Sequence, residues 1–207
     1  MTLRIAAAAA LILGLTTLLL YLHGIGKGPW ADPAARNLRR MKERAWPPAA
    51  TEPFTIAAMT ALPRWAGLSV YAPIERRGVA VEGYVQRMVR AGDDDIHLDF
   101  APETRGSEGP LVPFLSAEIT PAWHRGSTAW RYPRLVEALR PIFGGVTQWD
   151  QPPRRVRLSG WLMYDYPFEG SPPKGGFPRH VSFWEIHPVT GVELWDDSLA
   201  RFVEYPR

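Results

Sequence analysis

Short segments in which apolar and polar residues alternate, separated by proline and glycine, constrain the fold of this chain more than any other sequence feature. The chain has 21 prolines and 18 glycines among its 207 residues. Such frequent breaks favour a small all-β domain with many turns over a helical bundle. Alternation with a period of two places one face of each strand in the core and leaves the other face outside.

The order of these segments predicts a particular kind of barrel. The strand-like segments are residues 79–85, 96–100, 111–119, 156–164 and a last pair of runs, 181–186 and 189–195. Between the third and fourth segments, Pro133 to Leu139 reads as a helix, with Pro141 just past its end. Three strands, an insertion with a helix and two more strands follow the order of an OB-fold barrel. We therefore expect a mostly β, OB-fold-like five-stranded barrel with one short helix between strands 3 and 4.

The part of the chain before the barrel divides into two segments. Residues 5–22 are uncharged and apolar, and at about 1.5 Å per residue they are long enough to cross most of a bilayer. We predict a transmembrane anchor over residues 1–23, which stays uncleaved because no Ala-x-Ala pattern follows. Residues 24–77 then form a juxtamembrane helix, with Asp32 as its N-cap, and a Pro-rich linker. The OB-like barrel domain takes residues 78–207.

The predicted juxtamembrane helix carries a basic face. It consists of Arg36, Arg39, Arg40, Lys42 and Arg44. Near anionic headgroups each charge would contribute about 1 kcal/mol, and the alternative is an ordinary solvated helix face. A second short helix is predicted from Phe54 to Leu68.

Two arguments about the side of the membrane on which the barrel lies point in opposite directions. Positive residues after the anchor outnumber Arg4 before it, which counted literally favours a cytoplasmic body. However, a bare N-terminal apolar segment on an otherwise soluble domain usually serves export. We predict a single-pass protein of the inner membrane with its soluble domain in the periplasm.

A candidate polar cluster lies within three of the strand-like segments, at positions out of phase with the apolar residues. It comprises Asp95, His97, Asp99, Glu118, Glu185 and His187. In an OB barrel the third strand neighbours both the second and the fifth strand. Glu118 would therefore stand between His97 on one side and Glu185 or His187 on the other.

Three interpretations of this cluster stay open. His97, Glu118 and His187 could bind a divalent metal such as zinc or manganese, and an incomplete ligand shell would leave a position for water and hydrolysis. The cluster could instead be a structural set of cross-strand hydrogen bonds, or an acid/base or ligand-binding site without metal. No H-E-x-x-H or comparable local pattern supports the metal interpretation, so we expect no cofactor.

Nucleic acid is a further ligand that an OB surface could bind. Tyr84, Arg87 and Tyr164 are the candidate surface residues, because stacking on aromatic rings and contacts from basic side chains hold single strands. The formal net charge is only +3, and an extracytoplasmic location makes nucleic acid an unexpected partner.

The motifs also resemble those of a known group. Their succession is Gly-Tyr-Val, Asp-x-His-Leu, Ala-Glu-Ile, Val-x-Leu-x-Gly-Trp-Leu and Trp-Glu-Ile-His-Pro-Val. It is similar to small bacterial, often exported, OB-fold-like proteins that carry D-x-H-x-x-(L/F), E-I and a closing E-(I/L)-H-P signature. The similarity covers about residues 78–195. It implies the fold and a shared polar cluster, and it supplies no substrate.

These observations favour binding over catalysis. We predict a membrane-anchored, extracytoplasmic OB-like binding or interaction module, which as an accessory subunit would meet a protein partner in a membrane complex. The alternative is a metal-dependent, nuclease-like hydrolase that uses His97, Glu118, Glu185 and His187. A chain without cysteine has no disulfide, thiolate metal site or cysteine nucleophile.

Overall fold

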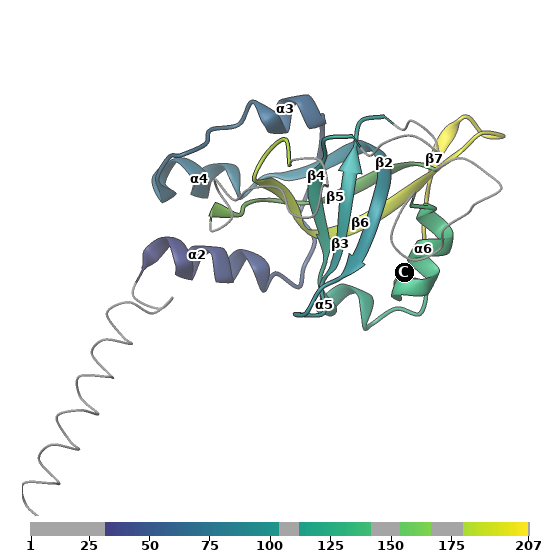
Figure 1. The fold of residues 1–207 in the computed structure, drawn as a ribbon, viewed down its shortest axis with the longest axis horizontal. Helices are drawn as coiled ribbons and strands as arrows, with labels where there is room; N and C mark the ends of the chain where they lie inside the picture. Colours follow the sequence, from purple (N-terminus) through teal and green to yellow (C-terminus); the bar gives the residue numbers. More distant parts are fainter. Residues whose placement is uncertain (1–31, 104–111, 142–153, 167–179, 207) are drawn as a thin grey trace, which may run out of the picture. The chain divides into compact units, whose positions relative to one another are not determined.

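The computed structural model describes most of the chain after the predicted anchor (Figure 1). The described residues are 32–103, 112–141, 154–166 and 180–206. The anchor predicted over residues 1–23 lies outside them. Within these ranges, no helix has the length and apolar character that a membrane span requires. Residues 41–207 form one compact unit, and residues 1–40 form another.

The described elements alternate a few short helices with longer strands. The helices are α2 (Pro33–Lys42), α3 (Ile56–Thr60), α4 (Leu68–Ile74), α5 (Pro121–His124) and α6 (Tyr132–Leu139). The strands are β1 (Glu52–Phe54), β2 (Gly78–Arg90), β3 (Ile96–Ala101), β4 (Leu115–Ile119), β5 (Arg155–Tyr164), β6 (Trp184–Asp196) and β7 (Arg201–Glu204). At the start of α2 the Asp32 carboxylate accepts a hydrogen bond from the backbone N–H of Ala34, at 2.9 Å, as a capping residue does.

Five strands close into a barrel. β2 pairs antiparallel with β3, β3 with β4, and β6 with β5, while β4 and β6 run parallel. β2 also pairs antiparallel with β5, from Gly78 opposite Trp161 to Tyr84 opposite Arg155, which closes the ring. The short helices α5 and α6 lie between β4 and β5 in the chain. The predicted mostly β fold, with a closed five-stranded barrel and a short helix, is therefore confirmed.

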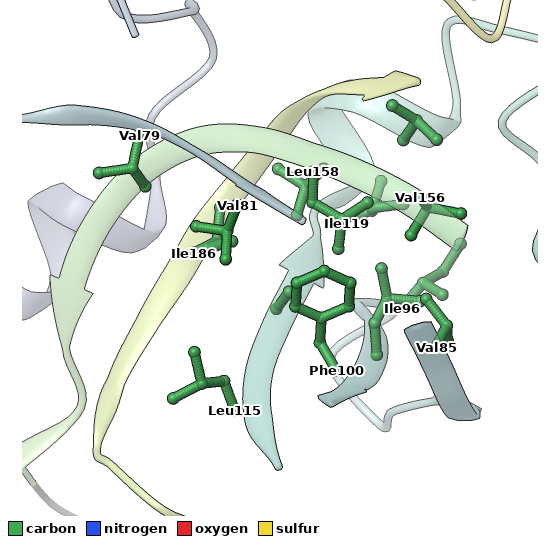
Figure 2. Close-up of a cluster of buried hydrophobic side chains, with 14 of the residues drawn as sticks. Val79, Val81, Val85, Ile96, Phe100, Leu115, Ile119, Val156, Leu158 and Ile186 are labelled. Carbon is green, nitrogen blue, oxygen red and sulfur yellow. The ribbon is translucent and has the colours of Figure 1, made fainter. Parts of the chain in front are cut away.

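The interior of the barrel is filled by apolar residues that recur at every second position of the strands (Figure 2). They include Val79 and Val81 of β2, Ile96, Leu98 and Phe100 of β3, Leu115, Ala117 and Ile119 of β4, Leu158 of β5, and Ile186 and Val189 of β6. All of these side chains are fully buried. Because successive strand residues point to opposite faces, the residues between them project from the outer face of the barrel.

The segment before residue 78 also contributes to this core. β1 pairs in parallel with β2, and the side chains of Ile56, Met59 and Tyr71 belong to the same cluster of buried residues. Of the helix predicted from Phe54 to Leu68, only the short α3 forms, because Phe54 belongs to β1 and α4 begins at Leu68. The break follows from the chain between them, where Pro63 cannot continue a helix and Trp65 has a left-handed φ of 54°.

The last predicted pair of runs forms a single long strand, β6, despite the proline between them. Gly160 pairs with Val189 and Leu162 pairs with Ile186, so the register between β5 and β6 shifts around Pro188. A proline within a sheet is tolerated at such a bulge because its missing N–H is not needed there. β7 follows β6 as a hairpin partner that the sequence pattern did not predict.

Candidate functional site

The polar cluster lies on the outer face of β3, β4 and β6. Glu118 of β4 is the direct cross-strand partner of His97 in β3, and β6 runs along the other side of β4. Ile119 and Ile186 point into the barrel, and therefore their neighbours Glu118, Glu185 and His187 point outward. This outer face is nevertheless covered, since Glu118, Glu185 and His187 are all buried.

Glu118 is the centre of the cluster, because it lies between two imidazoles. Its Oε1 is 3.3 Å from Nδ1 of His97, and its Oε2 is 3.0 Å from Nε2 of His187. The Ser116 hydroxyl donates to Oε1 at 3.5 Å. The side chain of Glu118 is only 3% exposed, whereas that of His97 is 37% exposed. His97 therefore forms the outer edge of the cluster and His187 its interior.

Asp95 completes a compact group with Glu118 and His187. Its Oδ2 is 3.6 Å from Nε2 of His187. One ligand atom from each of the three residues lies within 4.8 Å of the other two, and all three residues are buried. The sequence interpretation named His97, Glu118 and His187 as the possible metal ligands. In the structure Asp95, from the turn before β3, takes the place of His97 in this group.

Asp99, by contrast, does not join the cluster. It lies opposite Ser116, two residue pairs further along the sheet than His97 and Glu118, and its carboxylate accepts two hydrogen bonds from the Arg87 guanidinium, at 2.5 and 3.2 Å. Burial raises the pKa of Asp99, and the Arg87 charge opposes this effect. Arg87 and Asp99 therefore form a separate ion pair.

Two charged residues that the sequence interpretation missed, Asp165 and Lys42, also act on the carboxyl groups of the cluster. Asp165, directly after β5, is buried, and its charge raises the pKa of Glu185. Lys42, at the end of α2, interacts with the carboxylates of Asp165, Glu118, Glu185 and Asp95, and these charges raise its pKa although burial opposes them. Asp165 could have been anticipated because β5 ends beside the start of β6. Lys42 has no sequence signal beyond membership of a basic helix face.

The pKa of Glu118 is lowered and the pKa of His187 is raised. Burial opposes ionisation of Glu118, but the close approach and charge of His187, with the charges of His97 and Lys42, lower its pKa to about 2. Burial disfavours the charged imidazole of His187, but the carboxylates of Asp95 and Glu118 raise its pKa above the ordinary value. In mildly acidic solution Glu118 is therefore an anion facing a cationic His187.

The pKa values of Glu185 and Asp165 are raised, whereas that of Glu118 is lowered. Burial, together with the charges of Glu118 and Asp165, raises the pKa of Glu185 well above its ordinary value. Burial also raises the pKa of Asp165, and Glu118 adds to this effect while Lys42 opposes it. Glu185 therefore keeps a proton at pH values where an exposed glutamate has lost it.

We expect Glu185→Gln to stabilise the protein in alkaline solution. Because the folded pKa of Glu185 is raised, its contribution to stability is fully present below the unfolded value of about 4.5 and is lost as pH rises through the folded pKa. Glutamine has no proton to lose, so the variant should unfold at a higher temperature than the parent at pH 8, and the gain should disappear near pH 4. Thermal unfolding followed by circular dichroism, with EDTA present, measures this difference.

Glu193→Gln is the matched control, because it removes a half-exposed ion pair with Arg157 at 3.3 Å. It should not become more stable than the parent as pH rises from 4 to 8, and any loss from the broken ion pair should stay below about 1 kcal/mol. A Glu185→Gln protein that is less stable than the parent at pH 8 would show that Glu185 is ionised and paired.

The three residues predicted to bind nucleic acid do not form one surface. Tyr164 is only 1% exposed and packs against Tyr71 and Trp184, with ring centroids 4.1 and 5.0 Å away. It therefore lies in the core and is not a surface residue. Tyr84 lines a separate cavity of about 830 Å³, whose wall contains no residue of the cluster.

The cluster has the chemistry of a cation site. Asp95, Glu118, Glu185 and Asp165 provide four buried carboxyl groups, and His187 adds an imidazole nitrogen. Oxygen and imidazole ligands in this combination suit zinc, manganese and iron. A scan of protein-family models and a search of curated proteins each find no match to this sequence.

Proposed function

We propose that this protein is a cation-binding module built on an OB-type barrel, with its ligand held on the outer face of β3, β4 and β6. The pairing order β2-β3-β4-β6-β5, closed by β2 with β5, supports the OB assignment. The parallel contact between β4 and β6 and the helices between β4 and β5 support it too, because both are features of that fold.

The position of the cluster is the observation that carries the proposal. OB folds bind their ligands on the face of their second and third strands, between the loop that joins strands 1 and 2 and the loop that joins strands 4 and 5. In this barrel those strands are β3 and β4. Asp95 ends the connection from β2 to β3, and Asp165 begins the connection from β5 to β6. The position of the cluster matches the ligand-binding position of an OB fold, and this match supports the proposal.

The charged groups of the cluster favour a positively charged ligand. Four buried carboxyl groups lie near one lysine and His187, and burial together with mutual repulsion raises the pKa values of Glu185 and Asp165. A bound cation would stabilise the ionised forms of these carboxyl groups. The same charges would repel the phosphates of a nucleic acid. Burial of Glu118 and His187 further favours a small ion over a large organic cation.

The apolar stretch of residues 5–22 supports the second part of the proposal, which is that the module is anchored in the inner membrane and acts in the periplasm. Such a module would serve a membrane complex as an accessory subunit. Hydrolysis is a second candidate activity, favoured by the exposed edge of His97, through which a substrate could reach an ion at Glu118.

Thermal unfolding in the presence of different ions tests the proposed function. The full chain, in a mild non-ionic detergent because of its apolar N-terminal segment, is first treated with EDTA. We expect its melting temperature to rise with at least one small cation, either metallic or ammonium-like, and not with single-stranded DNA. The rise should vanish in Glu118→Gln and persist in Glu193→Gln. Stabilisation by DNA alone, or by no ion, would contradict the proposal.

A further inference from the structure

We propose that the ligand of this module is a divalent transition-metal ion of the zinc type, coordinated by Asp95, Glu118 and His187. This inference rests on the proposed cation-binding function and names its ligand. It makes Oδ2 of Asp95, Oε2 of Glu118 and Nε2 of His187 the coordinating atoms. The three residues come from the turn before β3, from β4 and from β6.

The distances from His187 to the other two ligand atoms are close to those of a tetrahedral site. Zinc binds oxygen and imidazole nitrogen at about 2.0–2.2 Å, which separates two ligand atoms of a tetrahedron by about 3.4 Å. Nε2 of His187 is 3.0 Å from Oε2 of Glu118 and 3.6 Å from Oδ2 of Asp95. These two distances lie on either side of the ideal value. An ion could thus enter with small side-chain movements.

The atoms that face the proposed ion also lack other partners. Nε2 of His187 and Oε2 of Glu118 are buried and make no hydrogen bond in the part of the chain that the structure describes. Their 3.0 Å approach therefore lacks hydrogen-bond geometry. The side chain of His187 is 0% exposed, so bulk solvent does not reach this nitrogen. A buried polar atom without a partner destabilises the folded state, and a metal ion would remove this cost at both atoms.

The surroundings of Glu118 orient it for this role. Its other oxygen, Oε1, is held by Nδ1 of His97 at 3.3 Å and by the Ser116 hydroxyl at 3.5 Å. Contacts of this kind fix a coordinating carboxylate and direct its free oxygen to the metal. His97 is accordingly a positioning residue rather than a ligand. Three protein ligands leave a fourth position for water, as in zinc sites that bind or transform a further ligand.

A second group of possible ligands shares Asp95. Asp93, Asp95 and His97 also place one ligand atom each within 4.8 Å of the others, but Asp93 is exposed and His97 is half-exposed. His97 also has a buried Nε2 that makes no hydrogen bond among the described residues, but Asp95 is the one fully buried member of this group, whereas Asp95, Glu118 and His187 are all buried. The Asp95, Glu118 and His187 group is therefore the stronger candidate, and variants at Asp93 and His187 distinguish the two.

The test measures zinc directly. The full chain is purified in detergent without chelator or affinity metal, its metal content is determined by mass spectrometry, and the EDTA-treated protein is titrated with Zn²⁺. We expect about one equivalent of bound zinc. Affinity should fall at least about 100-fold in His187→Gln and in Asp95→Asn, because loss of even an outer partner of a ligand costs about 10- to 100-fold. Asp93→Asn should bind zinc within about threefold of the parent.

Circular dichroism shows whether each variant is folded, and if His187→Gln is not, the comparison of Asp95→Asn with Asp93→Asn decides. Zinc bound by His187→Gln and lost by Asp93→Asn would overturn the inference in favour of the surface group. Absence of zinc binding to the parent would also overturn it. In that case Glu118-dependent stabilisation by another small cation would leave the proposed function standing, and no stabilisation by any cation would remove both.

Discussion

Replacing Glu118 with glutamine should lower the free energy of unfolding by about 3 kcal/mol at pH 6 in the presence of EDTA. The raised pKa of His187 keeps it charged at this pH, and Glu118 is its nearest anion, at 3.0 Å. Breaking a buried ion pair costs about 3–5 kcal/mol because the remaining charge is left without compensation. We expect the lower end of this range, since Asp95 stays 3.6 Å from the imidazole.

The destabilisation caused by Glu118→Gln should decrease both at lower and at higher pH. The folded pKa of Glu118 is lowered, so its stabilisation is present above the unfolded value of 4.5 and is lost as pH falls toward about 2. The folded pKa of His187 is raised, so the charge that Glu118 compensates is lost as pH rises through that value. The difference between parent and variant should therefore be greatest in mildly acidic solution. Urea unfolding at a series of pH values measures it.

Glu193→Gln again provides the control, because its half-exposed pair with Arg157 is expected to contribute at most about 1 kcal/mol. A double-mutant cycle with His187→Gln separates the interaction of Glu118 and His187 from the effect of each change alone. A Glu118→Gln protein as stable as Glu193→Gln at pH 6 would show that no charged pair exists at this position.

Gly160→Ala should destabilise the barrel by about 3 kcal/mol or more. Gly160 lies in β5 between β2 and β6, and a Cβ atom there would be 2.3 Å from the carbonyl oxygen of Pro188 and 2.8 Å from Cγ2 of Ile186. Overpacking of a core usually costs about 1–3 kcal/mol. The cost should reach or exceed the upper value here, because a backbone atom must move. Chemical denaturation monitored by tryptophan fluorescence measures the loss.

The same substitution connects the barrel to the site, because Pro188 follows His187 directly in the chain. If the backbone of β6 moves to admit the methyl group, His187 moves with it, and zinc affinity should fall as well. Gly92→Ala is the matched control, since a Cβ atom at Gly92 would meet nothing within 4 Å. We expect its stability to change by less than about 1 kcal/mol. Equal stability of the two variants would mean that β6 can shift freely at Pro188.

Much of the candidate site follows from the period of two along single strands. In β3, Ile96 and Leu98 are apolar and His97 lies between them, so the sequence alone assigns His97 to the outer face. The same argument assigns Glu118 in β4 and His187 in β6. The prediction that the third strand stands between the second and the fifth depends further on the order of the strands and the helix.

The exact membership of the cluster depends on register, which a strand's own sequence does not contain. Asp99 lies on the same strand and the same face as His97, but it is opposite Ser116 and forms an ion pair with Arg87. Asp95 lies before the strand begins, yet its carboxylate reaches His187. A displacement of two residues along β3 therefore decides whether a carboxylate belongs to the cluster.

The sequence by itself determined the segments of the five barrel strands, the outward face of each one and the barrel that their order builds, because alternation and chain breaks are local properties. Only the tertiary structure decided that Lys42 and Asp165 join the cluster, that Tyr164 is buried and that β6 continues past Pro188. These features depend on contacts between residues far apart in the chain. Closure of the barrel brings those residues together, and burial among them sets which carboxyl groups keep a proton and which stay charged.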